Sequence, residues 1–216
     1  MEKQGVPFLF LALLAFSGLG IEALLAFLIE PLIYGQSMSE WGVAKNILHW
    51  IITCTIWGVI SLLLYKAACR RYSFNLFSFR EKPRLINWLI CLSALAACIV
   101  LSIIDWNGLK VVKEFQYNGF LKFIFQYIYY GFEAVLVLLI IAFGQRAGEH
   151  FFSVKNIPWG GILAGLTWGL VHMLTVGSIF SGLYFCLFGV LYGVIYLGAK
   201  KNTFISYTLI LLTFIL

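Results

Sequence analysis

Long apolar runs separated by short polar connections dominate the pattern of this chain. A helix that crosses a membrane needs about 20 mostly apolar residues, because each residue adds about 1.5 Å to its length. Six runs come near that length, and a shorter one ends the chain: 8–29, 48–65, 85–104, 119–143, 159–177, 182–199 and 203–216. The pattern therefore predicts an all-α fold, a polytopic transmembrane helix bundle with about six or seven spanning helices.

The connections between the runs carry most of the charge. The third run ends in a turn at 105–108, the most polar connection is 66–84, and a second polar loop is predicted over 144–158. No internal repeat or low-complexity linker divides the sequence. We therefore expect a single transmembrane domain over residues 1–216.

The composition agrees with a membrane protein. Hydrophobic residues make up 62% of the chain and charged residues 11%, whereas soluble domains carry about 25% charged residues. So little charge cannot cover a soluble surface, and the lipid bilayer is the expected partner. The net charge of +6 is no sign of a nucleic-acid partner, because the basic residues lie in loops beside apolar runs.

The basic residues also predict how the chain is oriented. If the N-terminus is cytoplasmic, eleven of the fifteen basic residues fall on the inner side and four on the outer side. Inner loops of membrane proteins are richer in lysine and arginine. The bias predicts a multi-pass protein of the cell membrane with a cytoplasmic N-terminus. The segment 66–84, in which basic and aromatic residues alternate, is then expected to lie on the inner membrane surface.

Cysteine and histidine patterns give no sign of a disulfide framework, a metal or a cofactor. The five cysteines are odd in number, mostly lie in apolar runs and include no CxxC pair. No HExxH motif occurs, because Glu149-His150 is followed by two phenylalanines. A zinc site needs about three protein ligands. We therefore expect neither a metal nor a cofactor.

Ionisable side chains inside the apolar runs are the candidates for chemistry, since each costs at least about 2.5–3.5 kcal/mol at the membrane centre. Glu22, Glu133 and His172 lie deep in predicted spans. Glu30 is predicted to be an interfacial residue, and His49 is predicted to sit at a helix end. Glu22 is deep enough to face the same cavity as Glu133.

Glu133 shares a helix face with two other polar residues. Gln126, Tyr130 and Glu133 follow i, i+4, i+7 spacing, which aligns them on one side of a helix. We expect this stripe to face the interior of the bundle and to bind a ligand there. The alternative interpretation is a hydrogen-bond network that only fastens helices together.

His172 has a comparable setting in the fifth run. Gly161, Gly165, Trp168 and His172 fall on one face, and the glycines allow another helix to approach closely. A neutral imidazole both donates and accepts hydrogen bonds, so it suits proton transfer. It equally suits a hydrogen bond between two helices, which is the alternative interpretation.

The depths of Glu133 and His172 match. Glu133 lies about 15 Å and His172 about 18 Å from the inner ends of two consecutive, antiparallel spans, at 1.5 Å per residue. Sequential antiparallel helices are usually neighbours. An acid and an imidazole at one depth are suited to activate a water molecule as general base and acid. We therefore name Glu133 and His172 as candidate catalytic residues, with Gln126, Tyr130, Trp168 and Glu22 as candidate binding residues.

Three segments occur in a recognisable order: Phe-Glu-Ala at 132–134, Trp-Gly-Leu-Val-His at 168–172 and a glycine-spaced helix at 188–197. This order resembles the CPBP family, the CAAX-protease and bacteriocin-processing membrane proteins also called Abi. Members carry Glu-Glu-x-x-x-Arg, then Phe-x-x-x-His some 35–40 residues later, a glycine-spaced helix, and a last helix with His-x-x-x-Asn or Asp. The resembling core covers about 119–216.

The resemblance implies a prokaryotic intramembrane protease in which a glutamate-activated water attacks the substrate and histidines and an asparagine hold the oxyanion. This chain departs from the pattern, because one glutamate and the arginine are missing and 203–216 contains no histidine, asparagine or acid. Glu149, His150 and Glu22 are the candidates to replace the missing groups. The departures predict weak or absent proteolysis.

Two functions therefore remain open. The first is an intramembrane endopeptidase of the CPBP type that cuts a membrane-associated peptide or protein. The second is a non-catalytic relative that binds a membrane partner, for instance in peptide immunity. A small transporter has less support, because no pair of broken helices is visible in the sequence.

Overall fold

The computed structural model describes residues 5–78 and 81–216, which are almost entirely helical and contain no strand. The prediction of an all-α bundle is confirmed. Lys3 and Arg80, two of the basic residues on which the predicted orientation depends, lie outside the described residues.

Five rods in the described part of the chain are long and apolar enough to cross a membrane, and two shorter apolar helices complete the bundle. The first rod joins α1 (Gly5–Leu24), the π-helical turn η2 (Leu25–Ile29) and α2 (Glu30–Tyr34). The other long rods are α3 (Val43–Tyr72), α4 (Leu85–Trp106), α5 (Lys110–Phe152) and α8 (Ile179–Gly198). The shorter ones are the continuous run of α6 (Trp159–Ala164), the π-helical turn η4 (Gly165–Gly169) and α7 (Leu170–Val176), and then α9 (Thr203–Ile215). A 3-10 turn, η3 (Met38–Glu40), precedes α3.

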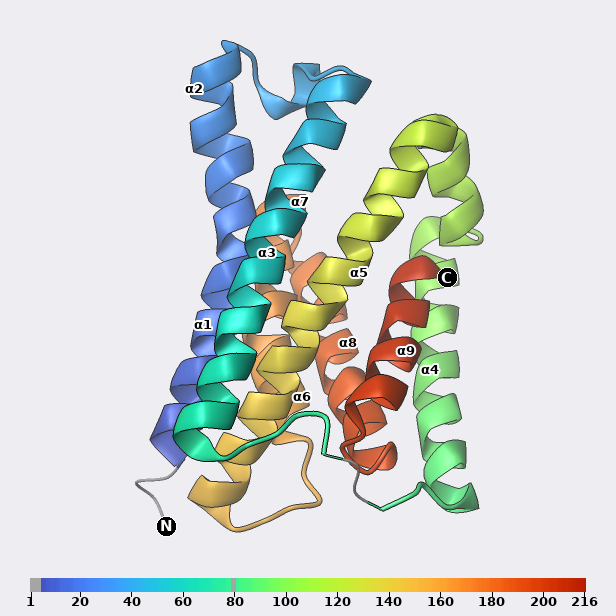
Figure 1. Cartoon of the computed structure of the whole chain (residues 1–216). Coiled ribbons are helices and arrows are strands. Elements are labelled where there is room, and N and C mark those ends of the chain that lie inside the picture. Colours follow the sequence, from blue (N-terminus) through green and yellow to red (C-terminus); the bar gives the residue numbers. More distant parts are fainter. Residues whose placement is uncertain (1–4, 79–80) are drawn as a thin grey trace.

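Helix α5 is the centre of the bundle. It contacts α1, α3, α6 and α9, and it runs obliquely between the α1–α3 side and the α4–α9 side (Figure 1). Every residue from Leu136 to Phe143 is buried, so this stretch of α5 is covered by protein on all sides. A helix that is apolar all round belongs in such a position.

The predicted end of the first span at Ile29 is wrong, because the helical rod continues to Tyr34. Proline has no amide hydrogen and normally interrupts the α-helical ladder. Here Pro31 lies in the first turn of α2, directly after the π-helical turn, where the hydrogen-bond pattern is already widened. Glu30 is therefore inside the rod rather than at its end.

Most of the predicted polar loop at 144–158 is also wrong, since α5 continues to Phe152. Two of the polar residues that suggested a loop, Gln145 and Glu149, are buried and bonded instead. Gln145 is 1% exposed; its amide donates to the backbone carbonyl of Ile157 at 3.0 Å and accepts from the Gly160 amide at 3.2 Å. These bonds fasten the end of α5 to the start of α6.

At its other end, α5 begins before the predicted span and bends sharply. Gly119 has φ +68° and ψ 173°, a backbone conformation that favours glycine. The bend turns the segment from Lys110 to Asn118 back beside the main part of the helix, where the chain forms an arch (Figure 1). This arch brings Lys110 and Glu114 next to α5 residues that follow them by more than ten positions.

Glycines allow the α6–η4–α7 run to lie directly against α8. A Cβ atom at Gly161 would stand 2.6 Å from the Cα of Gly193, and one at Gly189 would stand 2.4 Å from the amide nitrogen of Gly165. Both distances are far below a van der Waals contact, so the two backbones touch. The close packing predicted from Gly161 and Gly165 is present, and it fixes the position of Trp168 and His172 relative to α8.

Candidate functional site

A cavity of about 340 Å³ lies between α4, α5, α7, α8 and α9. Eight of its lining residues are aromatic, and its polar residues include two carboxylates, a lysine and a histidine. The volume is that of a small ligand pocket. Its lining residues include Asp105, Trp106, Lys110, Tyr130, Glu133, Trp168, His172, Phe185, Tyr192, Thr213 and Phe214.

Glu133 and His172 both line this cavity, and Trp168 connects them. The Trp168 indole N–H donates to Glu133 Oε1 at 2.9 Å. The backbone carbonyl of Trp168 lies 2.8 Å from His172 Nδ1. One residue of the π-helical turn therefore orients the acid through its side chain and the imidazole through its backbone.

The contact at Nδ1 fixes the chemistry of His172. A carbonyl oxygen only accepts hydrogen bonds, so Nδ1 carries the proton. In the neutral ring, Nε2 is then an acceptor. The ring also stacks on Phe185, with ring centroids 3.9 Å apart, which holds its plane. His172 Nε2 is thus arranged to accept a hydrogen bond rather than to donate one.

Other hydrogen-bonding groups at the cavity come from residues that the sequence did not single out. The Lys110 ammonium donates to the backbone carbonyl of Phe214 at 2.8 Å and lies 4.3 Å from the centroid of the Tyr130 ring. The hydroxyls of Tyr192 and Thr213 are bonded to each other at 2.7 Å. The last helix therefore contributes a threonine hydroxyl at the cavity.

The three residues of the predicted stripe on α5 have two different roles. Tyr130 and Glu133 line the cavity, whereas Gln126 does not. Gln126 donates to Glu114 at 3.1 Å and to Tyr130 at 2.7 Å, and the Tyr130 hydroxyl donates to Glu114 at 2.5 Å. Gln126 thus belongs to a network that ties the arch onto α5, which is the fastening role that the sequence left as an alternative.

The expectation for His49 is wrong, because His49 is fully buried inside α3 rather than at a helix end. Glu30 is also buried by protein, with 3% of its side chain exposed. The two side chains meet at 2.5 Å between Glu30 Oε2 and His49 Nδ1. Glu22 lies on the other side of the ring, 3.7 Å from Nε2, and does not line the cavity of Glu133.

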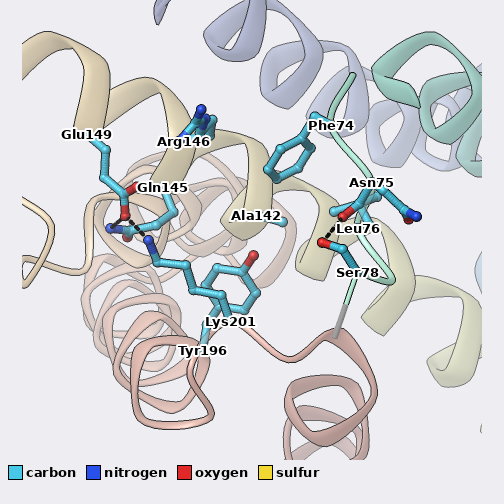
Figure 2. A pocket seen from close by; sticks show the side chains of 10 residues that line it. All are labelled: Phe74, Asn75, Leu76, Ser78, Ala142, Gln145, Arg146, Glu149, Tyr196 and Lys201. Carbon is cyan, nitrogen blue, oxygen red and sulfur yellow. Dashed lines mark hydrogen bonds and ion pairs between the residues drawn. The ribbon is translucent and has the colours of Figure 1, made fainter. Parts of the chain in front are cut away.

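Glu149 and His150, the other candidates to replace the missing motif residues, lie near the C-terminal end of α5, away from the arch. Figure 2 shows Glu149 beside Gln145 and Lys201; the Gln145 amide donates to Glu149 at 2.9 Å, and Lys201 forms an ion pair with it. The space among these side chains is only about 10 Å³, about one water molecule. Neither Glu149 nor His150 lines the cavity. The contacts of Glu149 join the end of α5 to the turn between α8 and α9.

Sequence reasoning missed several polar residues of the cavity, among them Asp105, Lys110 and Thr213. Lys110 lies 23 positions before Glu133 in the sequence. It lines the same cavity only because the arch folds back at Gly119. Thr213 is an uncharged residue in an apolar tail and has no motif around it. In the described part of the chain, no group of three or more His, Cys, Asp or Glu is arranged to hold a metal ion.

The bond from Trp168 to Glu133 leads to a prediction about stability. Trp168→Phe keeps an aromatic ring but removes the only donor atom of the side chain. A hydrogen bond to a charged group is worth about 1.5–3 kcal/mol, so we expect the free energy of unfolding in detergent micelles to fall by about that amount. Trp88→Phe, at an exposed tryptophan of α4, is the control and should change it little.

A double-mutant cycle separates this bond from simple loss of packing. If the indole acts through the carboxylate, Trp168→Phe should cost less in a Glu133→Gln background than in the wild type. Equal costs in the two backgrounds would contradict the contact.

The chain was compared with known proteins, and no protein-family model, curated protein or solved structure matches it.

Proposed function

We propose that this chain is a CPBP-like intramembrane endopeptidase of low turnover that cuts a membrane-associated peptide or protein at the cavity of Glu133 and His172. The observation that carries the proposal is the pair of contacts through Trp168, which hold an acid and an imidazole with Nε2 as acceptor at one cavity. The resemblance of the sequence to that family supports the same reaction.

In the proposed reaction, Glu133 takes a proton from a water molecule while the water oxygen attacks the peptide carbonyl. A new C–O bond forms, and the negative charge moves to the carbonyl oxygen. His172 Nε2 orients the water by accepting a hydrogen bond from its second O–H, which stays on the attacking oxygen. Glu133 then gives its proton to the leaving amine as the C–N bond breaks, which returns the carboxylate to its starting state.

Low turnover follows from the donors for the oxyanion. Each such donor typically contributes about 10²–10³ in rate, and the arginine and the last-helix histidine of the family are absent from this sequence. Lys110 is the nearest replacement at the cavity, but it already donates to the backbone of Phe214. The site therefore has a base, Glu133, and a hydrogen-bond acceptor for the water, His172 Nε2. It has few hydrogen-bond donors that are available to an oxyanion.

A second function is favoured by a different observation. Eight of the cavity's lining residues are aromatic, and large rigid rings are typical of binding surfaces. A relative that binds a membrane peptide without cutting it would use the same cavity. Cleavage and binding measured together on the wild type and Glu133→Gln distinguish the two functions, because hydrolysis needs the carboxylate and binding does not.

We further propose that the chain is a multi-pass protein of a prokaryotic cell membrane with a cytoplasmic N-terminus. The five long apolar helices support the membrane location, and the bias of basic residues supports the orientation. The end of α3 that carries Arg70 and Arg71 then faces the cytoplasm, as does the turn between α8 and α9 that carries Lys201.

Single-cysteine labelling tests this orientation. Ser73 is exposed just after α3 and Ser39 is exposed in the turn before it. In a background without the five native cysteines, we expect an impermeant thiol reagent added to intact cells to label Ser39→Cys and not Ser73→Cys. Labelling of Ser73→Cys and protection of Ser39→Cys would reverse the proposed topology.

A further inference from the structure

A second buried polar group lies between the first rod and α3, apart from the cavity. Glu30 Oε2 is 2.5 Å from His49 Nδ1, and the two side chains are 3% and 0% exposed. Trp41, which is 7% exposed, packs on the imidazole with ring centroids 5.6 Å apart. Because an ionised carboxylate only accepts hydrogen bonds, Nδ1 carries a proton in this pair.

The other nitrogen of the ring faces a second carboxylate. His49 Nε2 lies 3.7 Å from Glu22 Oε1, which is too long for a direct hydrogen bond and suits a bridging water. Nε2 and Glu30 Oε1 are both buried atoms without a hydrogen-bond partner among the described residues. An orphaned buried polar atom is costly, so the group is built to hold something more than these three side chains.

Charge balance indicates what it holds. Within the described residues, His49 is the basic group that forms ion pairs with Glu22 and Glu30. Lys45, one turn earlier on α3, is bonded to Gln36 at 2.5 Å instead. Two carboxylates beside one neutral imidazole would leave two uncompensated negative charges in a medium of low dielectric constant, which costs several kcal/mol for each charge. The group must therefore take up positive charge, and a proton is the cation that a histidine between two acids accepts.

We propose that Glu22, His49 and Glu30 form an intramembrane proton-binding site in which His49 passes protons between the two carboxylates. A proton that reaches Nε2 from Glu22 makes the ring an imidazolium. Transfer of the Nδ1 proton to Glu30 leaves a neutral ring that is protonated on Nε2. The reverse transfers restore the starting state, so protons are moved and no other bond changes.

The position of the site gives these transfers a direction along the membrane normal. Glu22 lies eight residues deeper in the first rod than Glu30, or about 12 Å at 1.5 Å per residue. On α5, Tyr129 packs against Trp50 and Trp57 of α3 and against Tyr130, which lines the cavity. The relay thus runs along the first rod, between Glu30 beside the turn at Trp41 and Glu22. The proton-binding site itself does not depend on the proposed peptidase reaction.

Nitrogen NMR of the wild type in lipid bilayers, with ¹⁵N-labelled histidine, tests the proposal. The chain has three histidines, so the His49 signals are assigned by comparison with His150→Gln and His172→Gln. We expect both ring nitrogens of His49 to carry protons at neutral pH, because the ring lies between two acids. Glu22→Gln should remove the second ring proton, whereas Thr53→Val, one turn along the same face of α3, should leave both in place.

A neutral His49 ring in the wild type would overturn the proposal, and this measurement needs no variant within the site to fold. A His49 ring that keeps both protons in a folded Glu22→Gln protein would overturn the role of Glu22. His49 signals that change only when zinc or another metal cation is added would overturn the proton assignment in favour of a metal. No peptide is involved, so failure here leaves the peptidase proposal untouched.

Discussion

Glu133→Gln should remove peptide cleavage by the purified protein. Glutamine keeps the shape of the side chain and still accepts the hydrogen bond from the Trp168 indole, but it takes no proton from water. A general base typically contributes about 10²–10⁴-fold, so we expect the rate to fall by that factor. The measurement is the rate of product formation from a membrane-associated peptide in lipid vesicles.

Two comparisons make the result specific. Glu40→Gln replaces a carboxylate that caps the exposed turn before α3 and should leave the rate unchanged. Binding of the same peptide should be nearly equal for the wild type and Glu133→Gln. Cleavage that persists in Glu133→Gln would show that another group activates the water.

Gly189→Leu should prevent the chain from forming its native bundle. A Cβ atom at this position would stand 2.4 Å from the amide nitrogen of Gly165, and backbone atoms cannot move aside as a flexible side chain does. Overpacking usually costs about 1–3 kcal/mol. We expect Gly189→Ala to cost about that much and the leucine to cost more. The measurements are thermal unfolding in detergent and the yield of monodisperse protein.

Gly20→Ala on α1 is the matched control, because no atom lies within 4 Å of a Cβ built there. Alanine is favoured over glycine inside a helix by about 1 kcal/mol, so this variant should be neutral or slightly stabilised. A Gly189→Leu protein that unfolds like the wild type would show that α6 and α8 are not in backbone contact.

The helices themselves were predictable, since their lengths and apolar runs are set by the thickness of the bilayer. Their ends were less so. The polar residues Gln145 and Glu149 suggested a loop, yet they lie inside α5 because tertiary partners satisfy them. In the same way, Pro31 suggested a helix end, but a π-helical turn accommodates it. Local patterns cannot show which buried polar groups will find partners elsewhere in the chain.

The candidate site was predictable to the extent that it depends on helix periodicity. The spacing from Trp168 to His172 places them on one face, and both line the cavity with Glu133. The position of Lys110 at the cavity depends on a bend at Gly119. The pair of Glu30 with His49 depends on a contact between separate helices. Such long-range geometry leaves no periodic signal, so the arch and the second polar group became visible only in three dimensions.

The most direct test of the proposed reaction is peptide hydrolysis in water enriched in ¹⁸O. The purified wild-type protein, in lipid vesicles, is incubated with membrane-associated peptides, and the products are analysed by mass spectrometry. We predict slow cleavage in which each new carboxyl terminus carries one ¹⁸O atom, because the attacking oxygen comes from water activated by Glu133. Peptides that bind to the protein and are recovered intact, without ¹⁸O, would contradict the peptidase reaction and favour the binding function.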